Sequence, residues 1–130
     1  MTTNGFAGFY LETRSYAETA AFWARLGFEN VFETDHGSGQ WAHPSGGPYV
    51  FISEQAEGEL ATHPIIDVAD SAQIGTGFDY VRPFTPQHWN VTEAIVRDPD
   101  GRNVSLQAPL PAGEAAPDAE AHHAEKYGSH

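Results

Sequence analysis

The chain has 130 residues, 40% hydrophobic and 12% aromatic, which is the size and composition of one globular domain. It has no cysteine, which excludes disulfides, thiolate zinc sites and a cysteine nucleophile, and its apolar runs are all shorter than the roughly 18 residues of a membrane span. The opening stretch MTTNGFAGFY lacks the basic start of a secretion signal, so we expect a cytoplasmic protein.

The formal net charge is −12, from 18 acidic and 6 basic residues. A surface of this sign repels nucleic acid and anionic lipid, so neither a nucleic acid nor a membrane is expected as a partner. Two interpretations of the charge stay open. Either it keeps the protein in solution, or it draws a cationic small molecule toward a binding site.

The first half of the chain alternates between short strand patterns and one helix pattern. FAGFYLET, at residues 6–13, is rich in aromatic and apolar residues, which favours a strand. SYAETAAFWARLG begins with the capping box of Ser15 and Glu18 and ends at Gly27, so it predicts a helix. Further strands are predicted over 28–34, 39–43 and 49–53.

The same order returns after a polar linker, EQAEGELAT. Asp70 and Ser71 are placed to begin a helix, but Gly75 and Gly77 end it almost at once. DPDG has the proline and glycine of a tight turn between the last two strands. The sequence thus predicts an internal β-α-β-β-β repeat of about 55 residues, with a vestigial second helix. Its strands are predicted over 64–69, 78–84, 89–97 and 103–108.

These patterns predict an α+β fold in which two βαβββ modules, over about residues 5–54 and 62–109, form a single domain at 1–110. Residues 111–130 are rich in alanine, glutamate, proline and histidine. We expect them to form an acidic, histidine-containing tail with a short helix. That helix is expected to cover the second sheet, from its own chain or by exchange with a partner chain.

Two motifs in this arrangement are typical of a known family. The helix end FWARLGFE and the closing DPDGRNVSLQAP, set in two βαβββ modules, resemble the vicinal oxygen chelate superfamily. That superfamily contains glyoxalases, extradiol dioxygenases, fosfomycin-inactivating enzymes and bleomycin-resistance proteins. The resemblance covers roughly residues 6–109. It implies mixed sheets curled into half-open cups, a binding cleft formed by paired cups, and a homodimer.

Metal-dependent members of the superfamily place ligands at four positions. The resemblance puts these positions on Gly8, on Tyr49 or Val50, on His63 and on Ser105. Only His63 has a side chain that commonly binds a divalent metal, so we expect no metal and no other cofactor; if a metal binds, His63 is its expected ligand. The resemblance is closest to the metal-free, bleomycin-resistance-like proteins, which sequester a drug without transforming it.

Aromatic side chains spread over both modules are candidates for the wall of a cup. Trp89, beside a turn in PQHWN, is the first candidate for a stacking platform, and Trp41 is the second. Tyr49 and Phe51 share one face of their strand by spacing. The alternative is that most of these aromatic residues belong to the core.

Polar candidates come from the second module. Glu93 and Ser105 are expected to be neighbours across the DPDG hairpin, where Glu93 accepts a hydrogen bond from a ligand or pairs with its positive charge. The alternative for Glu93 is an exposed carboxylate. Arg82 shares a predicted strand face with Tyr80 and Phe84, and it contacts the ligand or pairs with a nearby acid.

The sequence therefore predicts a homodimeric, metal-free protein without catalytic residues, which sequesters an aromatic or cationic natural product and confers resistance to it. Its predicted ligand-binding residues are Trp41, Tyr49, Phe51, His63, Arg82, Trp89, Glu93 and Ser105. One alternative is a metal-dependent lyase, isomerase or dioxygenase of the same superfamily that uses His63 with other ligands. Another is a protein whose dimer or tail serves interaction only.

Overall fold

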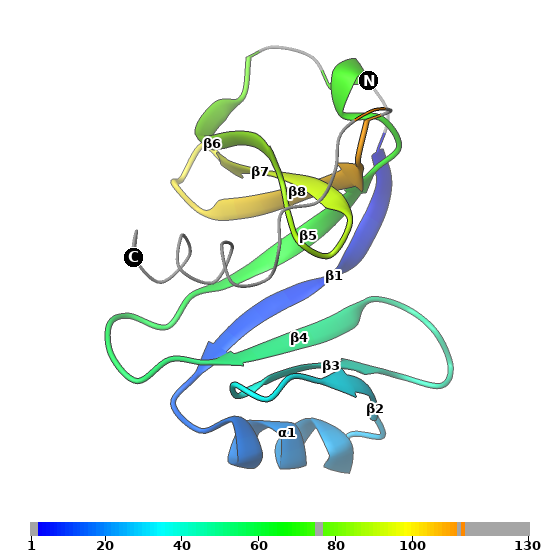
Figure 1. The fold of residues 1–130 in the computed structure, drawn as a ribbon. Helices are drawn as coiled ribbons and strands as arrows, with labels where there is room; N and C mark the ends of the chain where they lie inside the picture. Colours follow the sequence, from blue (N-terminus) through cyan, green and yellow to red (C-terminus); the bar gives the residue numbers. More distant parts are fainter. Residues whose placement is uncertain (1–2, 75–76, 112, 114–130) are drawn as a thin grey trace. The chain divides into compact units, whose positions relative to one another are not determined.

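The computed structural model describes residues 3–74, 77–111 and 113. The fold is α+β: one α-helix, within these residues, accompanies an eight-stranded mixed sheet (Figure 1). The strands are β1 (Thr3–Thr13), β2 (Glu29–Glu33), β3 (Ser38–Ala42), β4 (Tyr49–Glu54), β5 (Thr62–Val68), β6 (Asp79–Pro86), β7 (Val91–Arg97) and β8 (Asn103–Pro109). The helices are α1 (Tyr16–Arg25) and the 3₁₀ turn η1 (Ser71–Gln73).

The strands are hydrogen-bonded in the order β2-β3-β4-β1-β5-β8-β7-β6. This order is open, with β2 at one end and β6 at the other, and the curled sheets that the resemblance implied are not found. The chain divides into two compact units, Phe6–Ile65 and the combination of Met1–Gly5 with Ile66–His130. No helix among the described residues is long and apolar enough to cross a membrane.

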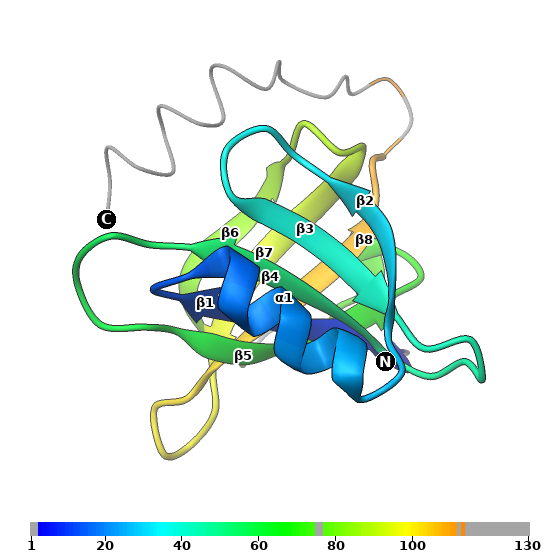
Figure 2. The ribbon, with the colours of Figure 1, turned by 90° about the horizontal axis from the view of Figure 1, so that it is seen from below.

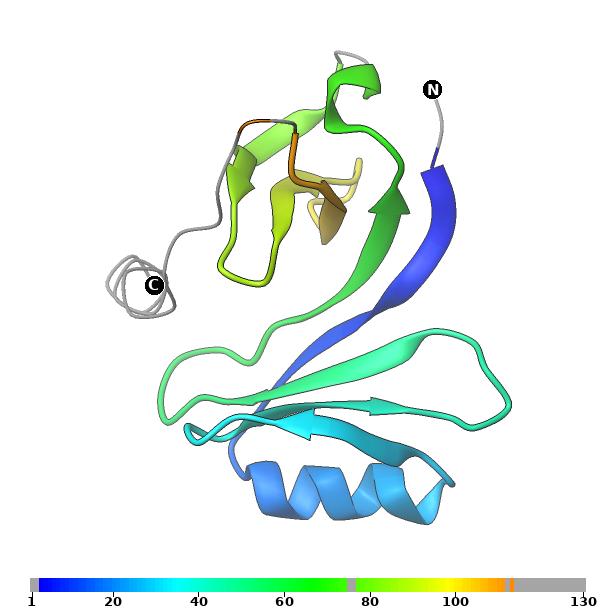
Figure 3. The ribbon, with the colours of Figure 1, turned by 45° about the vertical axis from the view of Figure 1, so that its right-hand side comes forward.

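The unit Phe6–Ile65 is built around the predicted helix. Ser15 begins α1, because its hydroxyl accepts the backbone N–H of Glu18 at 3.3 Å. The helix lies along one face of β3 and β4 (Figures 2 and 3). There Ala20 packs against Val50 and Ile52, the buried centre of this unit's core. Ser15 therefore caps α1 where the sequence predicts, although the backbone N–H of Ser15 donates to Thr13 Oγ1 rather than to Glu18.

The second unit holds the β6-β7-β8 meander and the vestigial helix. η1 has only three residues, and Asp70 caps it by accepting the backbone N–H of Ala72 at 2.9 Å. The core of the unit lies on one face of the meander. Its buried members are Val68, Ala94, Val96, Leu106 and Ala108.

The turn between β7 and β8 is fixed by Asp98. Its carboxylate accepts the backbone N–H groups of Asp100 and Arg102 at 3.0 and 2.8 Å. The Arg102 side chain also donates to Asp98, and this hydrogen bond holds the pKa of Asp98 below its usual value. Gly101 has φ +85°, a conformation that favours glycine. The turn therefore sets the register of the two strands that carry the polar candidates.

One prediction about strand faces is wrong. The register of β6 against β7 shifts twice, so that Arg82 lies opposite Ile95 and Thr85 lies opposite Glu93. Phe84 packs against the core, whereas Arg82 contacts Glu93, so the two side chains lie on opposite faces. Because the bulges break the alternation of side chains along β6, even spacing does not place these residues on one face. The helix predicted in the tail, over about 117–127, lies outside the described residues.

Candidate functional site

Polar side chains gather on the face of β7 and β8 that is turned away from the core. Strict alternation produces this separation, because Ala94 and Leu106 pair on the core face while Glu93 and Gln107 pair on the other. Ser105 lies on the same polar face, opposite Ile95. Burying a polar group on a strand face costs little free energy when its neighbours are hydrogen-bond partners.

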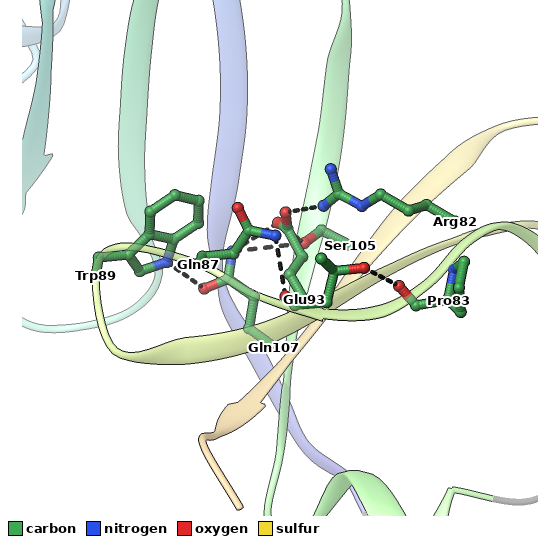
Figure 4. Close-up of polar contacts among 8 residues, drawn as sticks. Arg82, Pro83, Gln87, Trp89, Glu93, Ser105 and Gln107 are labelled. Atoms are coloured by element: carbon green, nitrogen blue, oxygen red, sulfur yellow. Dashed lines mark hydrogen bonds and ion pairs between the residues drawn. The ribbon is translucent and has the colours of Figure 1, made fainter. Parts of the chain in front are cut away.

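Glu93 is the centre of this polar cluster (Figure 4). Arg82 Nη2 donates to Glu93 Oε1 at 2.5 Å, and both the Ser105 hydroxyl, at 2.5 Å, and Gln107 Nε2, at 3.0 Å, donate to Glu93 Oε2. The side chain of Glu93 is 13% exposed and Ser105 is fully buried. The predicted proximity of Glu93 and Ser105 is therefore confirmed, and the carboxylate is held by one charged and two neutral donors.

Trp89 lies at the edge of the cluster, on the turn that joins β6 to β7. Gln87 and Val91 close this turn with a backbone hydrogen bond of 2.8 Å, and Asn90 takes φ +66° to complete it. The indole is 41% exposed, and its Nε1 donates to Gln107 Oε1 at 3.5 Å. The sequence predicted a strand from residue 89, but β7 begins at Val91, and Trp89 projects from the tip of the hairpin.

Two polar atoms beside the cluster are buried without a hydrogen-bond partner among the described residues. They are Gln87 Oε1 and Arg82 Nε. Gln87 is only 2% exposed, and its Nε2 donates to the carbonyl oxygen of Thr85 at 3.0 Å. Buried acceptors without donors are rare in folded proteins, because each loses its hydrogen bonds to water.

The other unit carries an aromatic face rather than a polar cluster. The ring of Tyr10 stacks on His63, with centroids 5.0 Å apart, and on Phe51, at 6.3 Å. Tyr49 and Phe51 pair with Gly8 and Tyr10 across β4 and β1, so they share one face as predicted. A Cβ at Gly8 would stand 2.6 Å from the ring of Tyr49, which therefore fills the space beside this glycine.

Trp41 lies on the helix side of its sheet and is part of the core. It packs against the apolar cluster beneath α1, and its Nε1 donates to the Tyr16 hydroxyl at 3.1 Å. That hydroxyl donates to Glu33 at 2.6 Å. Burial, together with the hydrogen bond to Glu33, raises the pKa of Tyr16 to about 12. These contacts place Trp41 in the packing of this unit, and its predicted role in a ligand site stays a prediction.

The structure thus brings together only part of the predicted site. Arg82, Glu93 and Ser105 meet in one cluster with Trp89 at its edge, while Tyr49, Phe51 and His63 lie in the other unit. Sequence reasoning missed Gln107, Gln87 and Tyr10. The spacing of Gln107 two residues after Ser105 was a usable signal for a shared face. Gln87 had no comparable signal.

A divalent metal does not fit the four positions that the resemblance indicated. In the described part of the chain, no three histidine, aspartate or glutamate side chains gather as metal ligands. Gly8 offers no side chain, and the ring of Tyr49 fills the adjoining space. The carboxylate nearest Ser105 belongs to Glu93, whose two oxygens already accept three hydrogen bonds.

Sequence comparison gives no relatives: no protein-family model and no curated protein matches the chain. Comparison of structures does. A glyoxalase/bleomycin resistance protein/dioxygenase superfamily member from Vibrio splendidus 12B01 superposes with TM-score 0.61 at 15% identity, covering 82% of this chain and 99% of the other.

Two further structures have the same fold and carry different names. BphC, a halotolerant catechol dioxygenase, superposes with TM-score 0.61 at 15% identity, over 91% of this chain and 42% of its own. An NAD-dependent benzaldehyde dehydrogenase from Legionella pneumophila superposes with TM-score 0.55 at 12% identity, over 78% of this chain and 97% of its own. Identities this low show the fold and no activity. The chain therefore has the same fold as these three structures.

Proposed function

We propose that the protein binds a planar aromatic natural product at the Glu93 cluster, sequesters it without changing it, and so confers resistance to it. The observation that carries this proposal is the position of Trp89. Its partly exposed indole stands beside a buried polar cluster and donates to Gln107, a member of that cluster. An aromatic surface next to a few convergent polar groups is the usual composition of a small-molecule site.

The hydrogen bonds of Glu93 favour binding over catalysis. A general base needs a free lone pair directed at the proton that it removes. Glu93 Oε1 instead accepts from Arg82, and Oε2 accepts from Ser105 and Gln107. These donors hold the carboxylate in one orientation. A group held in this way positions a ligand and its neighbouring side chains, which is the role that we propose for Glu93.

The net negative charge of the whole protein, rather than the charge of the cluster, attracts a cationic ligand. Arg82 balances the charge of Glu93 at 2.5 Å, whereas the chain as a whole has a formal charge of −12. Such a field raises the local concentration of cations and acts mainly on the rate of association. A cation over the face of an exposed indole, such as that of Trp89, gains about a further 0.5–1 kcal/mol.

The proposal includes a homodimer as the binding form. It is supported by the exposed apolar side chains of the edge strand β2, where Val31 and Phe32 are 55% and 45% exposed. Exposed apolar side chains on an edge strand favour association with another protein surface. Sedimentation analysis of the full chain tests this part, and a monomer at micromolar concentration would contradict it.

The experiment that tests the function uses planar aromatic cations and an aromatic antibiotic. Proflavine, acridine orange and bleomycin are titrated into the full chain, and melting temperature and tryptophan fluorescence are recorded. We expect a saturable rise in melting temperature with at least one of them, because a ligand that binds only the folded state stabilises it. Expression of the protein should then raise the concentration of that compound needed to inhibit a sensitive bacterium. No shift with any of the three would overturn the proposal.

A further inference from the structure

Gln87 holds a buried hydrogen-bond acceptor in a fixed orientation. The side chain is 2% exposed, and Nε2 donates to the carbonyl oxygen of Thr85 at 3.0 Å. If the amide were rotated by a half-turn, Oε1 would face the carbonyl oxygen of Thr85, and the two acceptors would repel. The contact with Thr85 therefore fixes which amide atom is Nε2 and which is Oε1. Oε1 is then left without a donor among the residues that the structure describes.

The strand pairing places this acceptor on the polar face. Gln87 closes the β6–β7 hairpin by donating its backbone N–H to Val91, two pairs beyond the match of Thr85 with Glu93. Side chains alternate along each strand, so Gln87, Thr85 and Glu93 point to the same side. Figure 4 shows the amide of Gln87 beside the side chains of the Glu93 cluster.

The acceptor adjoins the proposed stacking surface. Only one residue separates Gln87 from Trp89, and the indole hydrogen-bonds to Gln107 of the cluster. The amide of Gln87 and the indole of Trp89 are therefore carried by the same hairpin turn. Burial of a polar atom without a partner is costly, and a bound molecule that supplies a donor removes this cost.

We propose that Gln87 Oε1 accepts a hydrogen bond from an exocyclic N–H or O–H group on the edge of the aromatic ligand. This inference rests on the proposed function, and it defines the ligand class more closely. Aromatic amines, amides and phenols meet the requirement. Aromatic carboxylates and fully alkylated amines do not, because they leave Oε1 unpaired or oppose it with another acceptor.

Two dyes that differ only at the amine groups test this inference. Proflavine and acridine orange share one planar acridinium ring with its ring N–H and one positive charge, but methyl groups replace every exocyclic amine hydrogen in acridine orange. We expect the wild-type chain to bind proflavine about tenfold more tightly, the effect of one hydrogen bond to an otherwise unpaired buried acceptor. Equal affinity of the two dyes would overturn the inference and leave the proposed function standing. Binding of neither dye would count against the proposed function itself.

A variant separates the hydrogen bond from the difference in size between the dyes. Gln87→Met keeps the length of the side chain without the acceptor, so the preference for proflavine should disappear or reverse. Gln73→Met is the matched control, since Gln73 is an exposed glutamine of η1 and is not a member of the Glu93 cluster. It should keep the preference. A preference that persists in Gln87→Met would contradict the inference.

A second variant covers the case in which Gln87→Met does not fold. Gln87→Asn keeps the amide but withdraws it by one methylene, and it should also lose the preference for proflavine. Circular dichroism confirms that each variant is folded before its affinities are compared. A folded Gln87→Asn protein with the full wild-type preference would show that Oε1 does not contact the dye.

Discussion

The hydroxyl of Ser105 donates to Glu93 Oε2 at 2.5 Å, joining β8 to β7 on the face opposite the core. The bond is diagonal, because Ser105 lies opposite Ile95 and Glu93 lies opposite Gln107. Ser105 is fully buried, so its hydroxyl does not hydrogen-bond to bulk water. It occupies the position for which the resemblance implied a metal-binding carboxylate, and the carboxylate comes instead from the neighbouring strand.

Replacement of Ser105 by alanine tests the strength of this contact. Ser105→Ala removes one of two donors to Glu93 Oε2 and should lower the free energy of unfolding by about 1–3 kcal/mol. Denaturant unfolding measures it. Ser45→Ala, at an exposed serine, should change stability by less than about 0.5 kcal/mol. Equal effects of the two substitutions would show that the hydroxyl contributes little.

The ion pair of Arg82 and Glu93 should contribute more than an exposed pair on the same strands. Arg82→Met leaves a carboxylate that is 13% exposed without its charged partner, and we expect a loss of about 1–2 kcal/mol, reduced by the 36% exposure of Arg82. Arg97→Met is the matched control, because Arg97 pairs with a 66% exposed Asp79 at 3.4 Å. Its loss should be below about 1 kcal/mol. The prediction fails if the control is the more destabilising change.

Tyr16 should make the protein less stable at high pH. Its pKa is raised from 10.0 to about 12, so above pH 10 the unfolded chain ionises this tyrosine while the folded chain keeps it neutral. The stabilisation is complete below pH 10 and is lost as the pH rises toward 12. The ultraviolet absorbance of tyrosinate is measured against pH in the wild type and in Tyr16→Phe. The difference between the two curves should show one tyrosine that ionises near pH 12. A difference curve centred near pH 10 would contradict the assignment.

Ligand binding should not depend on a divalent metal. The described residues bring no three metal-binding side chains together. We therefore expect substoichiometric metal in protein purified without a chelator, and an unchanged affinity for proflavine after treatment with EDTA. Elemental mass spectrometry and a repeat titration measure the two quantities. One ion per chain, lost in His63→Ala, would favour the alternative of a metal-dependent enzyme.

Local signals made part of this structure predictable. The capping box at Ser15 predicted α1, and the short η1 followed from two glycines placed soon after Asp70. The DPDG turn predicted the β7–β8 hairpin, and its register brought Glu93 next to Ser105. Each of these predictions depends on contacts between residues that lie close together in the sequence, where chain geometry leaves few alternatives.

Other features depended on interactions that spacing does not reveal. Two bulges in β6 place Arg82 and Phe84 on opposite faces, and no residue pattern marks a bulge of this kind. Trp41 faces the helix because its hydrogen bond to Tyr16 and the core beneath α1 are both on that side. Period-2 reasoning identifies two faces of a strand, but it does not say which one meets the core.

Fluorescence titration of proflavine into the wild type, Trp89→Leu and Trp41→Phe tests the central claim most directly. Loss of the indole at the edge of the cluster should weaken binding about tenfold, as for other rings stacked on tryptophan. Trp41→Phe changes a core residue, so it should lower stability and leave affinity unchanged. Saturable binding that weakens only in Trp89→Leu is the predicted result. Absence of binding, or equal affinity in wild type and Trp89→Leu, would contradict a ligand site at the Glu93 cluster.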